Sequence, residues 1–152
     1  MILLLCVAML QSGWLKVRLR ASKEIEDENI HKLFRALKEQ FNVTQKISLR
    51  YLPDTCFEGP LVHGVFITTV YIPRYMVSHW DADELETVLL HELSHVKRKD
   101  LWINWLQILV QSVYFFHPLV WWVNNKISIL REEACDDLVV SYLEDLAYIV
   151  NV

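Results

Sequence analysis

Glycine and proline are scarce in this sequence, with three and four residues respectively among 152. Because turns and low-complexity linkers depend on both residue types, their scarcity argues against a disordered chain and against a many-turned all-β fold. Cysteine is scarce as well, since Cys6, Cys56 and Cys135 lie far apart and form no CxxC pair. This pattern is typical of buried thiols or a reducing compartment, and it argues against a disulfide scaffold.

The sequence also lacks a strong excess of charge of either sign. Its formal net charge is −4, and lysine and arginine are spread along the chain. A nucleic-acid-binding protein would concentrate basic residues on one face, so no nucleic-acid partner is expected. The hydrophobic fraction of 53% exceeds the roughly 45–50% of ordinary soluble domains. The length allows one domain with a substantial core.

No charged residue precedes Lys16, and the chain opens with the apolar run Met1–Leu10. This run lacks the basic start of a secretory signal and is shorter than the roughly 20 residues of a spanning helix. We interpret residues 1–20 as a possible membrane-helix remnant with a basic flank, and residues 21–152 as one folded domain; a buried core helix is the alternative for the apolar run. The basic flank favours a cytoplasmic position for the domain.

Hydrophobic periodicity predicts a helix over residues 24–41 and an amphipathic, acidic helix over residues 126–146. Alternation predicts a strand over 46–52, and β-branched residues over 62–72 predict a strand pair or one long strand that ends at Pro73. Asp81 and Glu84 have the spacing of a capping box, so we expect a helix to begin there. Together these elements predict an α+β fold with a small β-sheet.

The segment His91-Glu92-Leu93-Ser94-His95 matches the HExxH pattern inside this predicted helix. Residues four apart share one helix face, so both imidazoles can bind the same ion, and neutral imidazole is a good zinc ligand. Glu92 lies beside them, where it can take a proton from a water molecule at the ion. The pattern therefore predicts His91 and His95 as metal ligands for zinc and Glu92 as the general base.

A catalytic zinc site needs a third protein ligand, and the acidic segment Arg131–Asp137 is the best candidate. Glu132 and Asp136 lie four residues apart, so Glu132 could bind the ion while Asp136 accepts the outer N–H of a ligating histidine. Glu133 and Asp137 have the same spacing, so spacing alone does not choose between the pairs. A solvated acidic helix face is the remaining alternative.

Residues 101–125 contain no charged side chain but seven aromatic residues, four of them tryptophan. One straight helix of this length would extend roughly 37 Å and carry Glu132 away from the HExxH histidines. We therefore expect an apolar helical hairpin over 101–125, broken near Pro118. Polar residues recur along one face and argue against full exposure to lipid: Asn104, Gln107 and Gln111.

Three stretches make the sequence resemble the BlaR/MecR-type antirepressor metallopeptidases, which are bacterial membrane proteins of the gluzincin type that sense β-lactams or related signals. The stretches are Leu89–Asp100, with the HExxH pattern, Phe116–Trp122, with His-Pro-Leu-Val-Trp-Trp, and Arg131–Asp136, with Arg-Glu-Glu-Ala-Cys-Asp. Residues Gly59–Phe66 and Tyr71–Pro73 are similar to the strand that precedes the family's site. The resemblance covers roughly residues 30 to 145.

The resemblance implies an ExxxD pattern that ends at Asp136, and so selects Glu132 as the third ligand. It also implies a cytoplasm-facing peptidase domain at the bacterial inner membrane, which cleaves itself or a partner such as a transcriptional repressor during signalling. The family's earlier membrane helices correspond at most to Met1–Leu15, and its sensor domain does not follow Val152. Thr68 stands where the family more often has proline. A fragment, a truncated product and a shorter relative all remain open.

A protein or peptide substrate is expected to add to a sheet edge beside the site, since extended peptides bind in this way. We assign Gly64, Val65 and Phe66 to substrate binding, with the strand Gly64–Ile72 at that edge. His117 is the best further histidine for a role in catalysis, whereas His31, His63 and His79 are expected to be structural or solvated. A non-catalytic membrane or interaction module that keeps its zinc site is the competing function, and homo-oligomerisation stays open.

Overall fold

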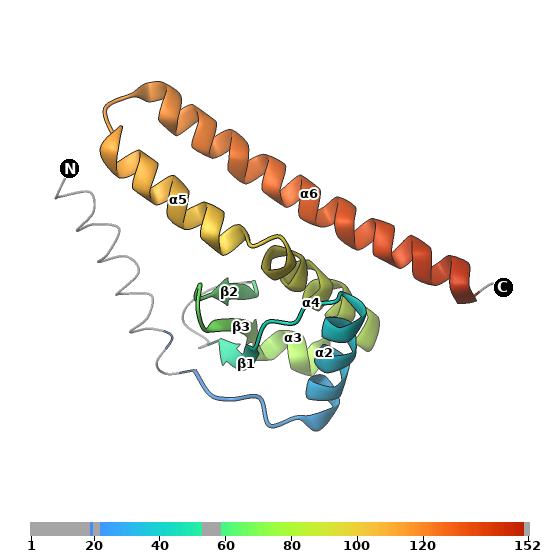
Figure 1. Ribbon diagram of the computed structural model, residues 1–152. Coiled ribbons are helices and arrows are strands. Elements are labelled where there is room, and N and C mark those ends of the chain that lie inside the picture. Colours follow the sequence, from blue (N-terminus) through green and yellow to red (C-terminus); the bar gives the residue numbers. More distant parts are fainter. Residues whose placement is uncertain (1–18, 20–21, 53–58, 151–152) are drawn as a thin grey trace.

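The computed structural model describes residue 19, residues 22–52 and residues 59–150, of which residues 145–150 are described by their backbone alone. The expected membrane-helix remnant therefore lies outside the described residues, apart from Leu19. The elements in chain order are α2 (Glu28–Gln40), β1 (Ile47–Leu52), β2 (Leu61–His63), β3 (Thr68–Pro73), α3 (Arg74–His79), α4 (Ala82–Lys97), α5 (Asp100–Val113) and α6 (Pro118–Val150). The expectation of an α+β fold with a small sheet is confirmed (Figure 1).

The ends of the helices follow local sequence signals. Asp81 accepts a hydrogen bond from the Glu84 amide at 2.9 Å while the Glu84 side chain accepts from the Asp81 amide, so the predicted capping box begins α4. At the end of α2, Asn42 adopts a left-handed conformation with φ 54°. The Asn42 amide donates to Glu39 O and the Val43 amide to Lys38 O, each at 2.9 Å, which is a Schellman motif.

The sheet has the strand order β1-β3-β2, with β1 parallel to β3 and β2 antiparallel to β3. The prediction that the strand Gly64–Ile72 lies at the sheet edge is therefore wrong. The strand begins at Thr68 and is central, because it pairs with both β1 and β2. Val70 and Ile72 are fully buried on one face, and Tyr71 is buried on the other. The short, half-buried strand β2 is the edge beside it.

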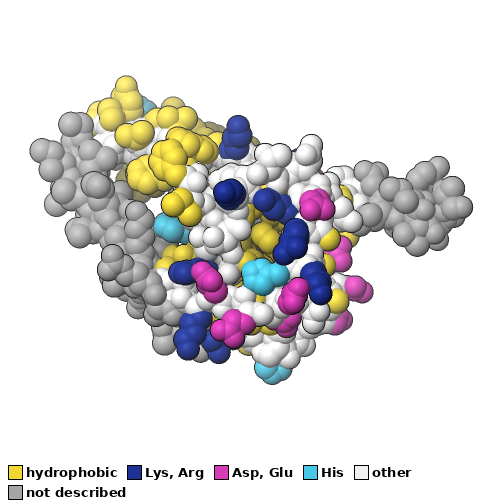
Figure 2. Space-filling model, turned by 60° about the horizontal axis from the view of Figure 1, so that its bottom comes forward, with side chains coloured by type: hydrophobic (Ala, Val, Ile, Leu, Met, Phe, Trp, Pro, Cys, Tyr) yellow, Lys and Arg dark blue, Asp and Glu magenta, His cyan; other side chains and the backbone are white. Residues whose placement is uncertain are grey.

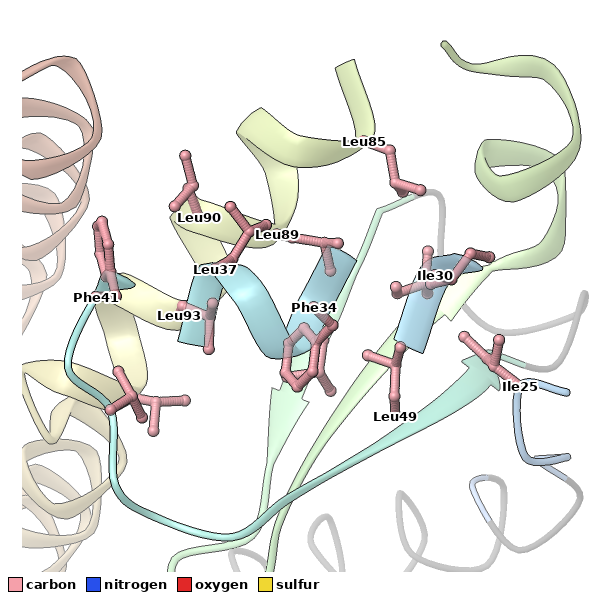
Figure 3. Packing of buried hydrophobic residues seen from close by; sticks show 14 of the residues in the cluster. Ile25, Ile30, Phe34, Leu37, Phe41, Leu49, Leu85, Leu89, Leu90 and Leu93 are labelled. Atoms are coloured by element: carbon pink, nitrogen blue, oxygen red, sulfur yellow. The ribbon is translucent and has the colours of Figure 1, made fainter. Parts of the chain in front are cut away.

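The hydrophobic core lies between the sheet and the helices α2 and α4 (Figure 3). Leu49 of β1, Phe34 of α2 and Leu89 of α4 point into it from these three elements. On the opposite face of the sheet, Leu52 and Tyr71 pack against Leu19. Helix α4 is thus held on one side by the core, which fixes the side that it presents to α6.

Helices α5 and α6 run antiparallel and extend away from the sheet (Figure 1), with the turn between them at residues 114–117 and Pro118 at the start of α6. Polar side chains join the two helices: Gln107 donates to Asn124 O at 3.2 Å, Asn124 donates to Gln111 at 3.1 Å, and Arg131 bonds Gln107. Among residues 22–52 and 59–150, no helix is long and apolar enough to cross a membrane.

Candidate metal centre

The residues of the candidate centre come from α4 and α6, which pack against each other. His91 and His95 lie one turn apart on α4, and their rings meet edge to face with centroids 4.9 Å apart. Leu89, Leu90 and Leu93 on the same helix are fully buried in the core or beside it. The core therefore fixes the rotation of α4, and this rotation leaves the two histidines half-buried at the α6 side.

Glu132 on α6 faces both histidines. Its Oε2 atom lies 3.6 Å from His91 Nε2 and 3.7 Å from His95 Nε2. The structure therefore brings together the three residues that the sequence and the resemblance selected, across 37 to 41 positions of the chain. Their ligand atoms also form a group compact enough to hold one metal ion.

The three donor atoms fit a zinc ion. Two imidazole nitrogens and one carboxylate oxygen are the ligand set of a common class of catalytic zinc site, which leaves the fourth position open. Ligands about 2.0–2.1 Å from a tetrahedral ion lie about 3.3 Å from one another. The observed separations of 3.6 and 3.7 Å differ from this by a few tenths of an ångström, so small side-chain adjustments would complete the site.

Asp136 lies one turn beyond Glu132 and holds the other side of the His91 ring. Its Oδ1 atom is 3.1 Å from His91 Nδ1. An ionised carboxylate only accepts hydrogen bonds, so this contact favours a proton on Nδ1 and leaves Nε2 free for a metal. The position is compatible with the orienting role expected of Asp136, whereas no ion pair joins Asp137 to either histidine among the described residues.

Asp100, which the sequence analysis did not select, makes the corresponding contact to the second histidine. Its Oδ2 atom lies 2.9 Å from His95 Nδ1, and its side chain is almost fully buried at the start of α5. The residue follows Lys97-Arg98-Lys99, so it resembles the end of a solvated charge run. The available signal is its position, five residues after His95 and at the first turn of the next helix.

Cys135 completes the buried surroundings of His95. Its Sγ atom is 3.2 Å from His95 Nδ1 and 3.5 Å from Asp100 Oδ2. Burial raises the pKa of the Cys135 thiol from 9.0 to about 11, so the thiol stays protonated at neutral pH and can donate to Asp100. These three residues are also close enough for a metal, and their spacings of 2.9 to 3.5 Å equally suit hydrogen bonds. Asp100 and Cys135 are buried, however, so this cluster lacks the open position that a catalytic metal site keeps for water or substrate.

Glu92 lies between the two ligand histidines in sequence and is buried. Burial raises the pKa of its carboxyl from 4.5 to about 7; the proximity of His95 lowers the pKa in part, and the Glu132 carboxylate adds to the rise. A carboxyl that is desolvated and has a pKa near neutral pH matches what a general base needs. This is the property expected of the glutamate in an HExxH helix.

The remaining predicted residues lie away from this cluster or in loops. Gly64, Val65 and Phe66 occupy the turn between β2 and β3, where Gly64 has φ +96° and a Cβ would meet Ile67 O at 2.1 Å. Phe66 is 85% exposed and meets the Trp102 ring edge to face at 5.4 Å. His117 lies in the turn after α5, and α5 itself, Asp100–Val113, spans about 21 Å by helix rise.

An α+β domain with this constellation has the features of a metallopeptidase. A family model, described as BlaR1 peptidase M56, matches residues 1–149. The chain therefore belongs to this family, and the resemblance to BlaR/MecR-type membrane metallopeptidases is confirmed.

Two curated relatives are similar to the chain over most of its length. The chain is 35% identical over 120 residues, or 79% of its length, to the regulatory protein BlaR1 of Bacillus licheniformis. It is 24% identical over 141 residues, or 92% of its length, to the methicillin resistance mecR1 protein of Staphylococcus aureus. The matched regions make up 20% and 24% of these relatives, so the chain spans about a quarter or less of their length.

Proposed function

We propose that this chain is a zinc endopeptidase domain that hydrolyses peptide bonds in itself or in a cytoplasmic partner, such as a transcriptional repressor, as part of signal transduction. The observation that carries the proposal is the convergence of His91 Nε2 and His95 Nε2 on one carboxylate oxygen of Glu132. Membership of a peptidase family and the name of one relative, regulatory protein BlaR1, support the same function.

Each residue of the centre has a distinct role in this proposal. His91, His95 and Glu132 would hold zinc, which when bound lowers the pKa of a water ligand toward about 7 and polarises a carbonyl group. Glu92 takes a proton from the attacking water and delivers it to the departing amine, because it is buried beside the ligands. Asp136 keeps the proton of His91 on Nδ1 through the 3.1 Å contact.

The edge strand β2 is the place where we expect an extended substrate to bind. Among the described strands, β2 lies at one end of the order β1-β3-β2, and helix α4 contacts it. A peptide could add beside this strand through backbone hydrogen bonds, and the turn at Gly64, Val65 and Phe66 would flank it. This replaces the edge role first assigned to the strand Gly64–Ile72, since that strand proved to be central.

We also propose that the domain is associated with the bacterial inner membrane and faces the cytoplasm. Large hydrophobic side chains along α5 and the start of α6 are exposed, and Figure 2 shows hydrophobic side chains gathered at the end of the molecule where these helices meet. Soluble monomers rarely expose so extended an apolar surface. The exposed residues of this surface include Trp102, Trp105, Leu106, Leu109, Phe116, Trp121 and Trp122.

Replacement of the general base tests the catalytic part of the proposal. Glu92→Gln should keep zinc and lose peptide hydrolysis by about 10²–10⁴-fold or more, because the proton acceptor is removed while the ligands stay. The readouts are zinc content and self-cleavage, or cleavage of a supplied cytoplasmic partner. Glu86→Gln on the same helix is the matched control and should hydrolyse like the parent protein. Equal hydrolysis by Glu92→Gln and the parent would refute the proposal.

A further inference from the structure

Asp100 is buried against the ring nitrogen of His95 that points away from Glu132. The contact to His95 Nδ1 measures 2.9 Å, and the Asp100 side chain is 4% exposed, whereas the side chain of Asp136 is 68% exposed. The two histidines of the centre are thus held differently. His91 has a partner that water can replace, and His95 has one that water cannot reach.

The local structure stabilises a negative charge at this position. Asp100 is the first residue of α5, where the positive end of the helix dipole favours a carboxylate. Its other oxygen, Oδ1, lies 3.6 Å from Arg98 Nε. The chain reaches this arrangement through Lys99, which has φ 61° in the left-handed region. A non-glycine residue is strained there, and the surrounding contacts must offset this strain.

The chemistry of the Asp100 carboxylate, the His95 ring and the Cys135 thiol fixes the direction of the hydrogen bonds between them. An ionised carboxylate has no proton, so His95 Nδ1 must donate to Asp100 Oδ2. The Cys135 thiol, 3.5 Å from the same oxygen, is a second donor. A neutral imidazole that carries its proton on Nδ1 has a free lone pair on Nε2, and this is the atom that faces Glu132.

We propose that Asp100 is a positioning residue for the metal centre: with the thiol of Cys135, it locks His95 in the tautomer whose Nδ1 is protonated and whose Nε2 binds zinc. The inference rests on the proposed function for the identity of the metal. It assigns a role to two buried residues, Asp100 and Cys135, that do not touch the metal ligand atoms of the centre. The locked tautomer exists before the metal arrives, so it lowers the cost of binding.

The tautomer can be measured directly on the zinc-free full-length chain. Long-range ¹H–¹⁵N spectra distinguish a protonated Nδ1 from a protonated Nε2, and we expect His95 to show the Nδ1–H form in the parent protein. His117, an exposed histidine elsewhere in the chain, provides an internal reference. A His95 that carries its proton on Nε2 would overturn the proposal, and this result needs no variant to fold.

Zinc affinity, measured by competition with a chelator, supplies the second test. Asp100→Ala should weaken zinc binding by about 10–100-fold, as the loss of an outer-shell partner typically does. Asp100→Asn should fall between Ala and the parent, because its amide oxygen still accepts from Nδ1 without a charge. Cys135→Ser should bind more tightly than Cys135→Ala, since only the hydroxyl can replace the thiol donor. Asp137→Ala is the matched control and should equal the parent.

Parent affinity in both Asp100 variants would overturn the proposal, as would a second equivalent of zinc bound by Asp100 and Cys135. Neither the spectra nor the affinities depend on turnover. A protein that binds zinc through a locked His95 but hydrolyses no peptide would therefore contradict the proposed function alone. A hydrolase whose His95 is free to exchange tautomers would contradict this inference alone.

Discussion

At the scale of single residues, the choice between Glu132 and Glu133 decides where the third ligand lies. Both are exposed, but only Glu132 lies within 4 Å of the two histidines among the ion pairs of the described residues. Zinc-finger peptides bind zinc with about 10–16 kcal/mol over four ligands, so one ligand is worth roughly 3 kcal/mol.

Glu132→Ala should therefore lower zinc affinity by about 100-fold or more, since 1.4 kcal/mol corresponds to tenfold. Glu133→Ala, its neighbour with the same charge, should bind zinc like the parent protein. Isothermal titration or chelator competition measures both. If the two variants lose the same affinity, the third ligand is not the carboxylate that the structure places there.

The residues of the site differ in how far sequence could identify them. His91, Glu92 and His95 depend only on the spacing within one helix, so the pattern sufficed. Glu132 depends on how α6 crosses α4, which is a tertiary property, and only the resemblance to a family separated it from Glu133. Asp100 follows three basic residues that look solvated. Its burial results from the left-handed turn at Lys99, for which the sequence has no glycine signal.

At the scale of elements, the end of α2 contains a conformational constraint that can be tested. Asn42 adopts φ 54°, and asparagine tolerates this region better than other residues with a side chain. Asn42→Ala should lower the free energy of unfolding by about 1–2 kcal/mol, because alanine clashes there. Asn42→Gly should leave it unchanged or raise it. Chemical denaturation compares them, and equal stability of the Ala and Gly variants would contradict the assigned conformation.

The elements themselves were largely predictable, but their arrangement was not. The helix over 24–41 and the strand over 46–52 correspond to α2 and β1. Of the two possibilities for 62–72, a strand pair or one long strand, the structure has the pair β2 and β3. Strand order depends on which neighbour pairs with β3, and the local alternation carries no such information. The unbroken apolar run Val70-Tyr71-Ile72 was the available signal, since strands buried on both faces lose their alternation.

At the scale of the whole molecule, the end formed by residues 101–125 differs from the rest because its surface is apolar. Segment 101–125 has no charged residue, and most of its large hydrophobic side chains are exposed. If this surface contacts lipid, a charge placed in it should weaken binding to anionic phospholipid vesicles. Each acidic residue inserted into the apolar layer costs up to about 2.5–3.5 kcal/mol.

The double variant Leu106→Glu/Trp122→Glu should therefore lose at least tenfold in vesicle partitioning, measured by sedimentation with lipid. Ser141→Glu, which adds an acid on an exposed part of α6 outside this segment, should bind like the parent chain. Unchanged partitioning of the double variant would mean that the exposed apolar surface does not carry the membrane association.

The central claim is that α4 and α6 together hold one catalytic zinc ion. Anomalous diffraction at the zinc edge, from crystals of the zinc-loaded full-length chain, tests it most directly. We predict a single peak about 2.0–2.1 Å from His91 Nε2, His95 Nε2 and a carboxylate oxygen of Glu132. A peak on the Nδ1 side of His95, between Asp100 and Cys135, or no peak near the HExxH helix would contradict the account.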